Sequence, residues 1–178
     1  MRPQLHPDRR QLIASCLGLA VAALAGCATP PGGGGAPEAS AGEAPPGPSP
    51  MSDAQALEAT LQAMALVGTP YRFGGNTPEG GFDCSGLIGY VYRQAAGIVP
   101  PRTVLSISTW GQPVGSGHLR SGDLVLFGSR GTATHAGIHV GQGRFVHAPS
   151  TGGTVRLNSV REPYWSARWM MYRRPAVA

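Results

Sequence analysis

The sequence predicts an α+β domain in which helices come first and an antiparallel β-sheet of about five strands follows. Three observations predict this class. Between residues 52 and 110 apolar residues recur at the three- and four-residue spacing of helices. Beyond residue 120 the period changes to two, in short segments separated by glycine-bearing turns. No internal repeat is visible, and helices followed by strands are typical of an α+β domain with an antiparallel sheet.

Residues 1–26 are predicted to be an export signal rather than part of the fold. Three arginines within residues 2–10 give a positive start, and the apolar stretch 12–25 is too short to span a bilayer comfortably. Residues 24–27 (LAGC) resemble the lipobox of bacterial lipoproteins. That resemblance implies cleavage before Cys27 and lipid on its thiol. The alternative is an ordinary secretory signal with an incidental cysteine.

The residues after the signal imply a location. Ala28 stands where retention at the inner membrane typically needs aspartate, so the lipobox resemblance implies an outer-membrane lipoprotein of a Gram-negative cell, facing the periplasm. Residues 27–51 contain the lipidated cysteine and a Pro/Gly-rich stretch that cannot bury enough apolar surface to fold. This stretch is predicted to be a tether with a typical reach of ~25–30 Å. The folded domain is predicted over residues 52–178.

The sequence predicts two further helices, and the residues before each of them mark where it begins. Ser52 and Gln55 have the spacing of a capping box, and Gly68 marks the end of the first helix. Four apolar residues between them share one helical face, namely Leu57, Leu61, Met64 and Ala65. Residues 103–110, which follow two prolines, are predicted to form a short helix.

The second predicted helix carries Cys84 in its first turn. Asp83 is a good N-cap for this helix, and Gly97 ends it. A thiol at a helix N-terminus faces unpaired N–H groups and the positive end of the helix dipole, and both favour the nucleophilic thiolate. The alternative is a buried cysteine that packs as a small hydrophobe.

Short strands with period-two patterning follow. They are predicted over Leu124–Phe127, His135–Val140, Arg144–Ala148, Val155–Val160 and Ala167–Arg174. The connection between the second and third of these strands is predicted to be the three-residue loop 141–143. That loop places Ile138 opposite Val146 in the core and puts His147 on the same face as His135. A two-residue loop would put the two histidines on opposite faces.

Composition limits the possible partners and cofactors. The formal net charge is +5, but no basic run or basic-aromatic interleaving indicates a nucleic-acid groove. Cys16 and Cys27 lie in the leader, so Cys84 is the only thiol of the predicted domain and no disulfide can form within it. The cysteine and histidine spacing offers no zinc set, and we expect no metal or organic cofactor.

Four histidines lie in the predicted domain. His118 falls outside any periodic segment and is predicted to be a surface residue. His139 lies four positions along the strand from His135, ~13 Å at the strand rise, so both cannot serve one thiol. We expect His139 to be a solvent-facing strand residue or, as the alternative, a substrate contact.

Six segments occur in an order that resembles the NlpC-type cell-wall peptidases, a papain-like clan. They are residues 70–75 (PYRFGG), 83–86 (DCSG), 101–103 (PRT), 122–127 (GDLVLF), 135–138 (HAGI) and 144–148 (RFVHA). The resemblance covers about residues 52–175. It implies that Cys84 is the nucleophile, His135 the base and His147 the polar residue that orients the imidazole. It also implies that the Tyr71 hydroxyl helps to stabilise the oxyanion, beside the Cys84 backbone N–H.

The resemblance further implies a substrate. Asp83 and Ser85 match positions that line the substrate site in the family, although capping explains Asp83 by itself. The implied activity is a monomeric thiol hydrolase that cuts peptidoglycan stem peptides at the bond between D-glutamate and diaminopimelate. Two other classes stay open: a catalytically silent wall-binding or regulatory module on the same fold, and an amidase or acyltransferase of the same clan.

Overall fold

The computed structural model describes residues 49–177, and its first helix begins where the capping box predicts. Helix α1 (Asp53–Ala65) has Ser52 as its N-cap, and both reciprocal bonds between Ser52 and Gln55 form. The buried face of α1 consists of Ala56, Ala59 and Ala63. The larger apolar residues that share the other face are exposed: Leu57, Leu61 and Met64. Small side chains let α1 lie close to its neighbours, since a Cβ on Gly122 would collide with Ala56.

Helix α2 (Cys84–Ala96) forms as predicted, with Cys84 as its first residue. Asp83 caps it by accepting the Gly86 N–H at 2.6 Å, and Gly97 ends it in the left-handed region at φ +68°. The helix enters the core through Leu87, Ile88, Val91 and Tyr92. Glycine at position 86 is required because a Cβ there would collide with the carbonyl oxygen of Gly75. The start of α2 is therefore pressed against the preceding loop.

The short elements complete the chain. Helix α3 (Val104–Thr109) is capped by Thr103, and one 3₁₀ turn (Ser116–His118) follows it. Two small antiparallel ladders join β1 (Ser49–Pro50) to β10 (Ala176–Val177) and β2 (Asn76–Thr77) to β3 (Gly81–Phe82). Within the described residues no helix is both long and apolar enough to span a membrane.

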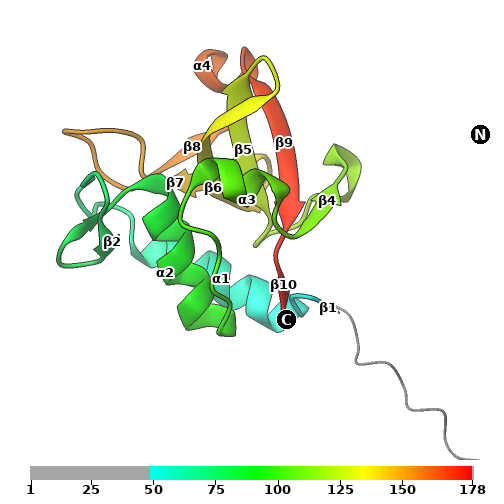
Figure 1. The fold of residues 1–178 in the computed structure, drawn as a ribbon, viewed down its shortest axis with the longest axis horizontal. Coiled ribbons are helices and arrows are strands. Elements are labelled where there is room, and N and C mark those ends of the chain that lie inside the picture. The colour runs from blue at the N-terminus through cyan, green and yellow to red at the C-terminus, as the bar shows by residue number, and fades with distance from the viewer. Residues whose placement is uncertain (1–48, 178) are drawn as a thin grey trace, which may run out of the picture. The chain divides into compact units, whose positions relative to one another are not determined.

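Six antiparallel strands form the main sheet, in the order β4-β9-β5-β6-β7-β8 (Figure 1). Their bounds are β4 Gln112–Val114, β5 Leu124–Ser129, β6 Thr132–Gly141, β7 Arg144–His147, β8 Arg156–Ser159 and β9 Trp169–Arg174. The five predicted strands are confirmed as β5 to β9. The prediction missed β4, an edge strand of three residues that contains Pro113 and so gives no alternating pattern.

The register of the β6–β7 hairpin is confirmed, but its turn is not the predicted one. Ile138 lies opposite Val146. The connection has two residues, Gln142 and Gly143, both with positive φ, and a register shift between His139 and Gly141 absorbs one further residue. The bulge has the same effect on register as a third loop residue, so His135 and His147 project from one face of the sheet.

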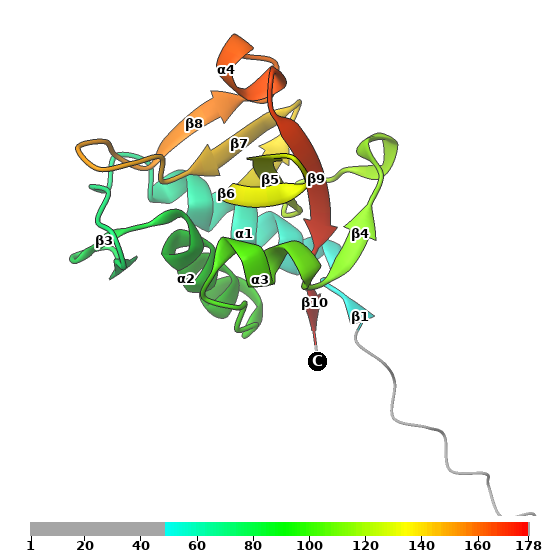
Figure 2. The same cartoon turned by 45° about the horizontal axis from the view of Figure 1, so that its top comes forward.

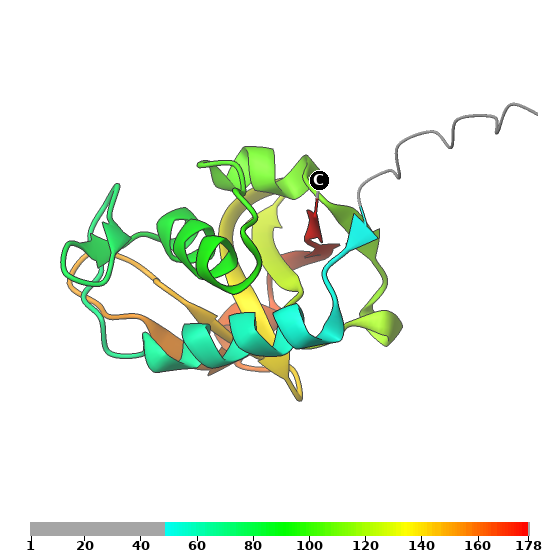
Figure 3. The same ribbon diagram turned by 90° about the horizontal axis from the view of Figure 1, so that it is seen from below.

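Each face of the sheet has its own core. Helices α1, α2 and α3 cover one face (Figure 3), whereas α4 (Pro163–Ser166) lies at the other (Figure 2). The large core contains the α2 residues with Leu124, Ile138 and Val146. The smaller core consists of Val125, Phe127, Phe145 and Trp165. His135 and His147 stand on the side of the smaller core, where their rings lie about 5 Å from the Trp165 ring.

Candidate active site

Cys84 lies where α2 meets β6. Its sulfur accepts backbone hydrogen bonds, including one from the N–H of Ala136, the residue after His135 on β6. The helix start therefore brings the only thiol of the described residues to the strand that carries His135. The sequence predicted both the helix position and the strand.

The protonation state of Cys84 differs from the prediction. Burial raises the pKa of the thiol, and the negative charge of Asp83 raises it further. Hydrogen bonds from the backbone N–H groups of Ala136, Ser85 and Cys84 itself lower the pKa, but by less. The expectation that the helix N-terminus makes a thiolate was wrong because desolvation outweighs the N–H donors, so the resting group is a thiol.

His135 and His147 are bonded directly to each other. The Nε2 atom of His135 lies 2.8 Å from Nδ1 of His147, and the two rings meet edge-on at 83°. His147 is fully buried, and the ring of His135 stacks on Trp165 with an interplanar angle of 26°. The histidine pair therefore packs against the aromatic residues of the smaller core.

The hydrogen bonds continue beyond His147 to a side-chain amide and then to a carboxylate. Nε2 of His147 lies 2.8 Å from Oδ1 of Asn158 on β8, and Nδ2 of Asn158 donates to Glu162 at 2.7 Å. Asn158 Oδ1 also accepts from Arg156 Nε at 2.9 Å. Glu162 is itself fixed, because its other oxygen accepts the N–H of Ser159 at 2.7 Å. The carboxylate can only accept, so it determines the orientation of the Asn158 amide.

This orientation determines the tautomer of both histidines. Asn158 presents an oxygen, so His147 must carry its proton on Nε2 and leave Nδ1 as an acceptor. His135 must then donate from Nε2, which leaves its Nδ1 unprotonated. The network therefore leaves His135 with one free, basic ring nitrogen.

Burial and nearby cations keep the histidine pair neutral. Burial lowers the pKa of His135 to about 3, and the neighbouring His147 ring and the charges of Arg156 and Arg168 act in the same direction. Burial likewise lowers the pKa of His147 to about 4, although the Asn158 bond opposes the shift. Near pH 7 the resting site contains a neutral thiol and a neutral imidazole.

Tyr71 borders the same site. Its backbone N–H donates to Gly153 at 2.8 Å, which ties the loop before α2 to the loop after β7. Burial raises the pKa of the Tyr71 hydroxyl, and the charges of Cys84 and Asp83 raise it further. The hydroxyl therefore stays protonated and can donate a hydrogen bond near the thiol.

Asp83 and Ser85 are already engaged by a residue that the sequence analysis did not place in the site. Arg102 donates to both carboxylate oxygens of Asp83, at 2.8 and 3.0 Å, and to the Ser85 hydroxyl at 2.5 Å. Asp83 also accepts from the Gly74 N–H at 2.9 Å. Arg102 lowers the pKa of Asp83 against the opposing effect of burial. A substrate contact for Asp83 and Ser85 stays a prediction, and the more exposed member of the cluster is Arg102.

The two remaining histidines lie away from this site. His118 is exposed, as predicted. His139 is only 4% exposed, so the expectation of a solvent-facing residue was wrong. Its Nδ1 lies 3.0 Å from the carbonyl oxygen of Arg120, and its backbone N–H donates to Asp123. The segment before β5 covers this end of β6, which strand alternation cannot reveal.

Several residues of the site were missed at the sequence level. They are Arg102, Arg156, Asn158, Glu162, Trp165 and Arg168. A usable signal existed for two of them, because pairing β8 with β7 in register puts Arg156 opposite His147 and Asn158 opposite Phe145. The others reach the site from separate segments.

The fold and this arrangement, with a thiol on a helix and imidazoles on a sheet, are those of a papain-like cysteine peptidase domain. The NlpC/P60 family model matches residues 68–174, and the chain belongs to that family. The chain is 41% identical over 115 residues to the murein DD-endopeptidase MepH of Escherichia coli (strain K12), covering 62% of this chain and 42% of that protein.

Two further relatives show the same domain. The chain is 40% identical over 115 residues to the gamma-DL-glutamyl hydrolase of Bacillus subtilis (strain 168), covering 64% of this chain and 28% of that protein. The crystal structure of the NlpC/P60 domain of the peptidoglycan hydrolase SagA matches with a TM-score of 0.58 at 34% identity, over 65% of this chain and 96% of that domain. The chain thus spans less than half the length of MepH and of the gamma-DL-glutamyl hydrolase.

The buried histidines predict a loss of stability in mild acid. Both have native pKa values below the unfolded value of ~6.5, so the unfolded chain binds more protons as the pH falls through 6.5. From pH 7 to pH 5 the free energy of unfolding should fall by about 2 kcal/mol for each histidine. Urea unfolding at the two pH values measures this loss.

The variant His147→Gln should lose less stability between pH 7 and pH 5 than the wild type, by about 2 kcal/mol. His118→Gln, at an exposed position, is the matched control and should lose as much as the wild type. Equal losses in the wild type and in His147→Gln would contradict a neutral, buried His147.

Proposed function

We propose that this chain hydrolyses amide bonds in the peptide stems of peptidoglycan, with Cys84 as nucleophile and His135 as base. Two observations carry the proposal: the hydrogen-bond chain from Glu162 to His135, which leaves one imidazole nitrogen of His135 without a proton, and the hydrogen bond to the Cys84 sulfur from the backbone N–H of Ala136, the residue after His135. A buried structural histidine pair needs no such tautomeric selection. A thiol hydrolase needs it, because the base must accept the thiol proton.

In the proposed reaction His135 acts first as a base and then as an acid. Nδ1 of His135 takes the proton of the Cys84 thiol while the sulfur attacks the carbonyl carbon of the amide. The oxyanion that forms accepts hydrogen bonds from the Cys84 backbone N–H and from the Tyr71 hydroxyl. The imidazolium then gives its proton to the leaving amine, and the C–N bond breaks. Water, deprotonated by His135, then attacks the thioester carbonyl carbon. The S–C bond breaks, the acid is released, and the Cys84 sulfur recovers its proton from His135.

His147 orients the base and disperses the charge that forms on it. When His135 becomes an imidazolium, its Nε2–H donates to a neutral His147 whose own proton is held by Asn158. The positive charge is created in a site that lowers its pKa, so the imidazolium is a reactive acid toward the leaving amine. His147 is thus a positioning residue, and it does not transfer a proton to substrate.

The family supports peptidoglycan as the substrate, and the relatives suggest two bonds. The resemblance in the sequence implies the bond between D-glutamate and diaminopimelate, and the gamma-DL-glutamyl hydrolase is named for a glutamyl bond. MepH is named for a DD bond. Digestion of purified muropeptides with mass spectrometry distinguishes the two, because stem cleavage and crosslink cleavage give products of different mass.

We also propose that the domain works from the outer membrane, as a lipoprotein facing the periplasm. Support comes from the lipobox ending at Cys27, from Ala28 after it and from the Pro/Gly-rich composition of the residues that follow. The predicted tether is shorter than expected, because Ser49 and Pro50 pair with β10 and Met51 is buried in the core, so the domain begins at residue 49 rather than 52. Cys27 and the rest of the tether lie outside the described residues.

Substitutions at the three central residues should have different effects on muropeptide cleavage. Cys84→Ala removes the nucleophile, so cleavage should fall to background. His135→Ala removes the base and should cost on the order of 10²–10⁴-fold in kcat. His147→Ala should cost less than His135→Ala, because a water molecule can partly replace an orienting group.

The control for these variants is His118→Ala, at an exposed histidine outside the network, which should cleave like the wild type. Circular dichroism confirms that each variant is folded. Undiminished cleavage by folded Cys84→Ala would rule out the thiol mechanism. Absence of cleavage by the wild type would favour a silent wall-binding module.

The lipid anchor has its own test. Intact-mass analysis and membrane fractionation should find acylated Cys27 at the mature N-terminus, and Cys27→Ser should move the protein to the soluble fraction with loss of the lipid mass. A Cys27→Ser protein that keeps the wild-type lipid mass and membrane location would contradict the proposal.

A further inference from the structure

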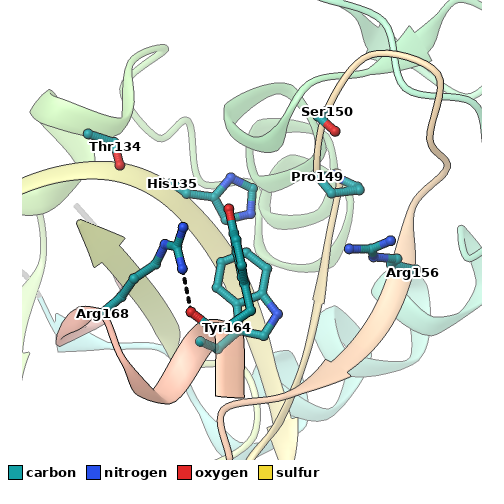
Figure 4. A pocket seen from close by; sticks show the side chains of 8 residues that line it. Thr134, His135, Pro149, Ser150, Arg156, Tyr164 and Arg168 are labelled. Carbon is teal, nitrogen blue, oxygen red and sulfur yellow. Dashed lines mark hydrogen bonds between the residues drawn. The ribbon is translucent and has the colours of Figure 1, made fainter. Parts of the chain in front are cut away.

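A cavity of about 370 Å³ opens beside His135, on the side of the sheet that α4 covers. Its walls include His135 and Trp165, and they carry two arginines, Arg156 from β8 and Arg168 just after α4 (Figure 4). Cys84 does not line it. The cavity is thus adjacent to the base rather than to the nucleophile.

Both arginines lack an acidic partner. The ion pairs found within residues 49–177 involve Arg102, Arg120 and Arg174. Arg156 uses its Nε on the neutral Asn158, which leaves both terminal nitrogens free of any protein hydrogen bond in the described part of the chain. Two guanidinium groups on one small cavity repel each other, and an anion bound between them offsets that repulsion.

Arg168 is held in place rather than left mobile. Its guanidinium stacks on the ring of Tyr164 at 3.4 Å from the centroid, and one terminal nitrogen donates to the Tyr164 carbonyl oxygen (Figure 4). The other terminal nitrogen makes no protein hydrogen bond within residues 49–177. A preorganised, half-buried cation with free N–H groups has the features of a carboxylate receptor.

The position of the cavity defines which part of the substrate enters it. The leaving amine must reach His135, because His135 supplies its proton. The acyl part of the substrate lies toward the thiol, the oxyanion donors and Tyr71, none of which lines the cavity. The residue that carries the leaving amine is therefore expected on the side of the cavity, near Arg156 and Arg168.

We propose that this cavity binds a carboxylate on the residue that supplies the leaving amine, with Arg156 and Arg168 as the cationic walls. The inference rests on the proposed function and specifies its substrate. Such a carboxylate occurs when the leaving amine belongs to the carboxyl-terminal residue of a peptide. It also occurs at a crosslink, where the amine stands beside a free carboxyl group on the side chain of a diamino acid.

The same contact assists the chemical step. Positive charge on Arg156 and Arg168 opposes formation of the His135 imidazolium, and a carboxylate between them offsets that charge. The carboxylate stabilises the transition state, in which the His135 imidazolium forms, more than it stabilises the ground state. A carboxylate on the leaving residue should therefore raise kcat in addition to lowering KM.

Matched substrates test the proposal directly. Two peptides share one acyl part and one leaving residue, which ends in a free carboxylate in the first peptide and in a carboxamide in the second. Wild-type protein should cleave the carboxylate peptide with a kcat/KM about 10- to 100-fold higher, the range expected for one charge-assisted hydrogen-bonded pair. Arg168→Gln and Arg156→Gln should each bring the ratio toward one, and Arg168→Lys should keep part of it.

The control variant is Arg93→Gln, an exposed arginine in the last turn of α2, which should keep the wild-type ratio. A wild-type ratio near one, with both peptides cleaved, overturns the carboxylate site and leaves the proposed function intact. A high ratio that neither Arg156→Gln nor Arg168→Gln reduces also overturns it. If wild-type protein cleaves neither these peptides nor muropeptides, the proposed function itself fails.

Discussion

The candidate site depends on one chain of hydrogen bonds that begins at a carboxylate and ends at an imidazole. Glu162 orients the Asn158 amide, Asn158 selects the tautomer of His147, and His147 selects the tautomer of His135. Each link is a requirement of donor and acceptor chemistry, because a carboxylate cannot donate and a neutral imidazole carries one proton. Arg156 supports the same orientation of the Asn158 amide, because its Nε–H can only donate to the amide oxygen.

The register of the paired strands, rather than any single loop, brings the residues of this hydrogen-bond chain together. The β6–β7 pairing places His147 on the face of His135, and the β7–β8 pairing places Asn158 two residues from the partner of His147. Glu162 follows directly as the N-cap position of α4, and Trp165 in the same helix packs on the His135 ring. A one-residue slip in β6 would remove His135 from the network.

Electrostatics explains why the Cys84 thiol and the His135 imidazole are neutral at rest, although the proposed reaction transfers a proton between them. Burial disfavours both the thiolate and the imidazolium, Asp83 acts against the thiolate, and Arg156 and Arg168 act against the imidazolium. Arg102 balances part of the Asp83 charge on the acyl side. On the leaving side no carboxylate within residues 49–177 forms an ion pair with Arg156 or Arg168, and we infer that the substrate supplies one.

Local sequence patterns correctly predicted the features that depend on neighbouring residues, namely helix ends and strand alternation. The caps at Ser52 and Asp83, the stop at Gly97 and the alternation of β5 to β9 were all visible, and they placed Cys84 correctly. The pattern misled where burial depends on distant segments. Alanines rather than leucines of α1 enter the core because the helix must lie close to Gly122, which the periodicity of α1 cannot show.

The same limit applies to the site. His139 is covered by a segment that carries no periodic signal, and the raised pKa of Cys84 depends on the depth at which α2 is buried. Arg102, Glu162 and Arg168 reach the site from three separate places in the chain. Their relation to the proposed reaction is seen only in the folded protein, for example in the hydrogen bonds that join Glu162 through Asn158 to His147.

The central claim is the tautomer of His135, and nitrogen NMR of the histidine rings measures it most directly. Long-range ¹⁵N–¹H correlation spectra at neutral pH distinguish protonated from unprotonated ring nitrogens. The hydrogen-bond chain predicts that His135 and His147 are both neutral, with the proton on Nε2 and an unprotonated Nδ1. A proton on Nδ1 of His135 in the free protein would contradict the chain and remove the base from the proposed mechanism.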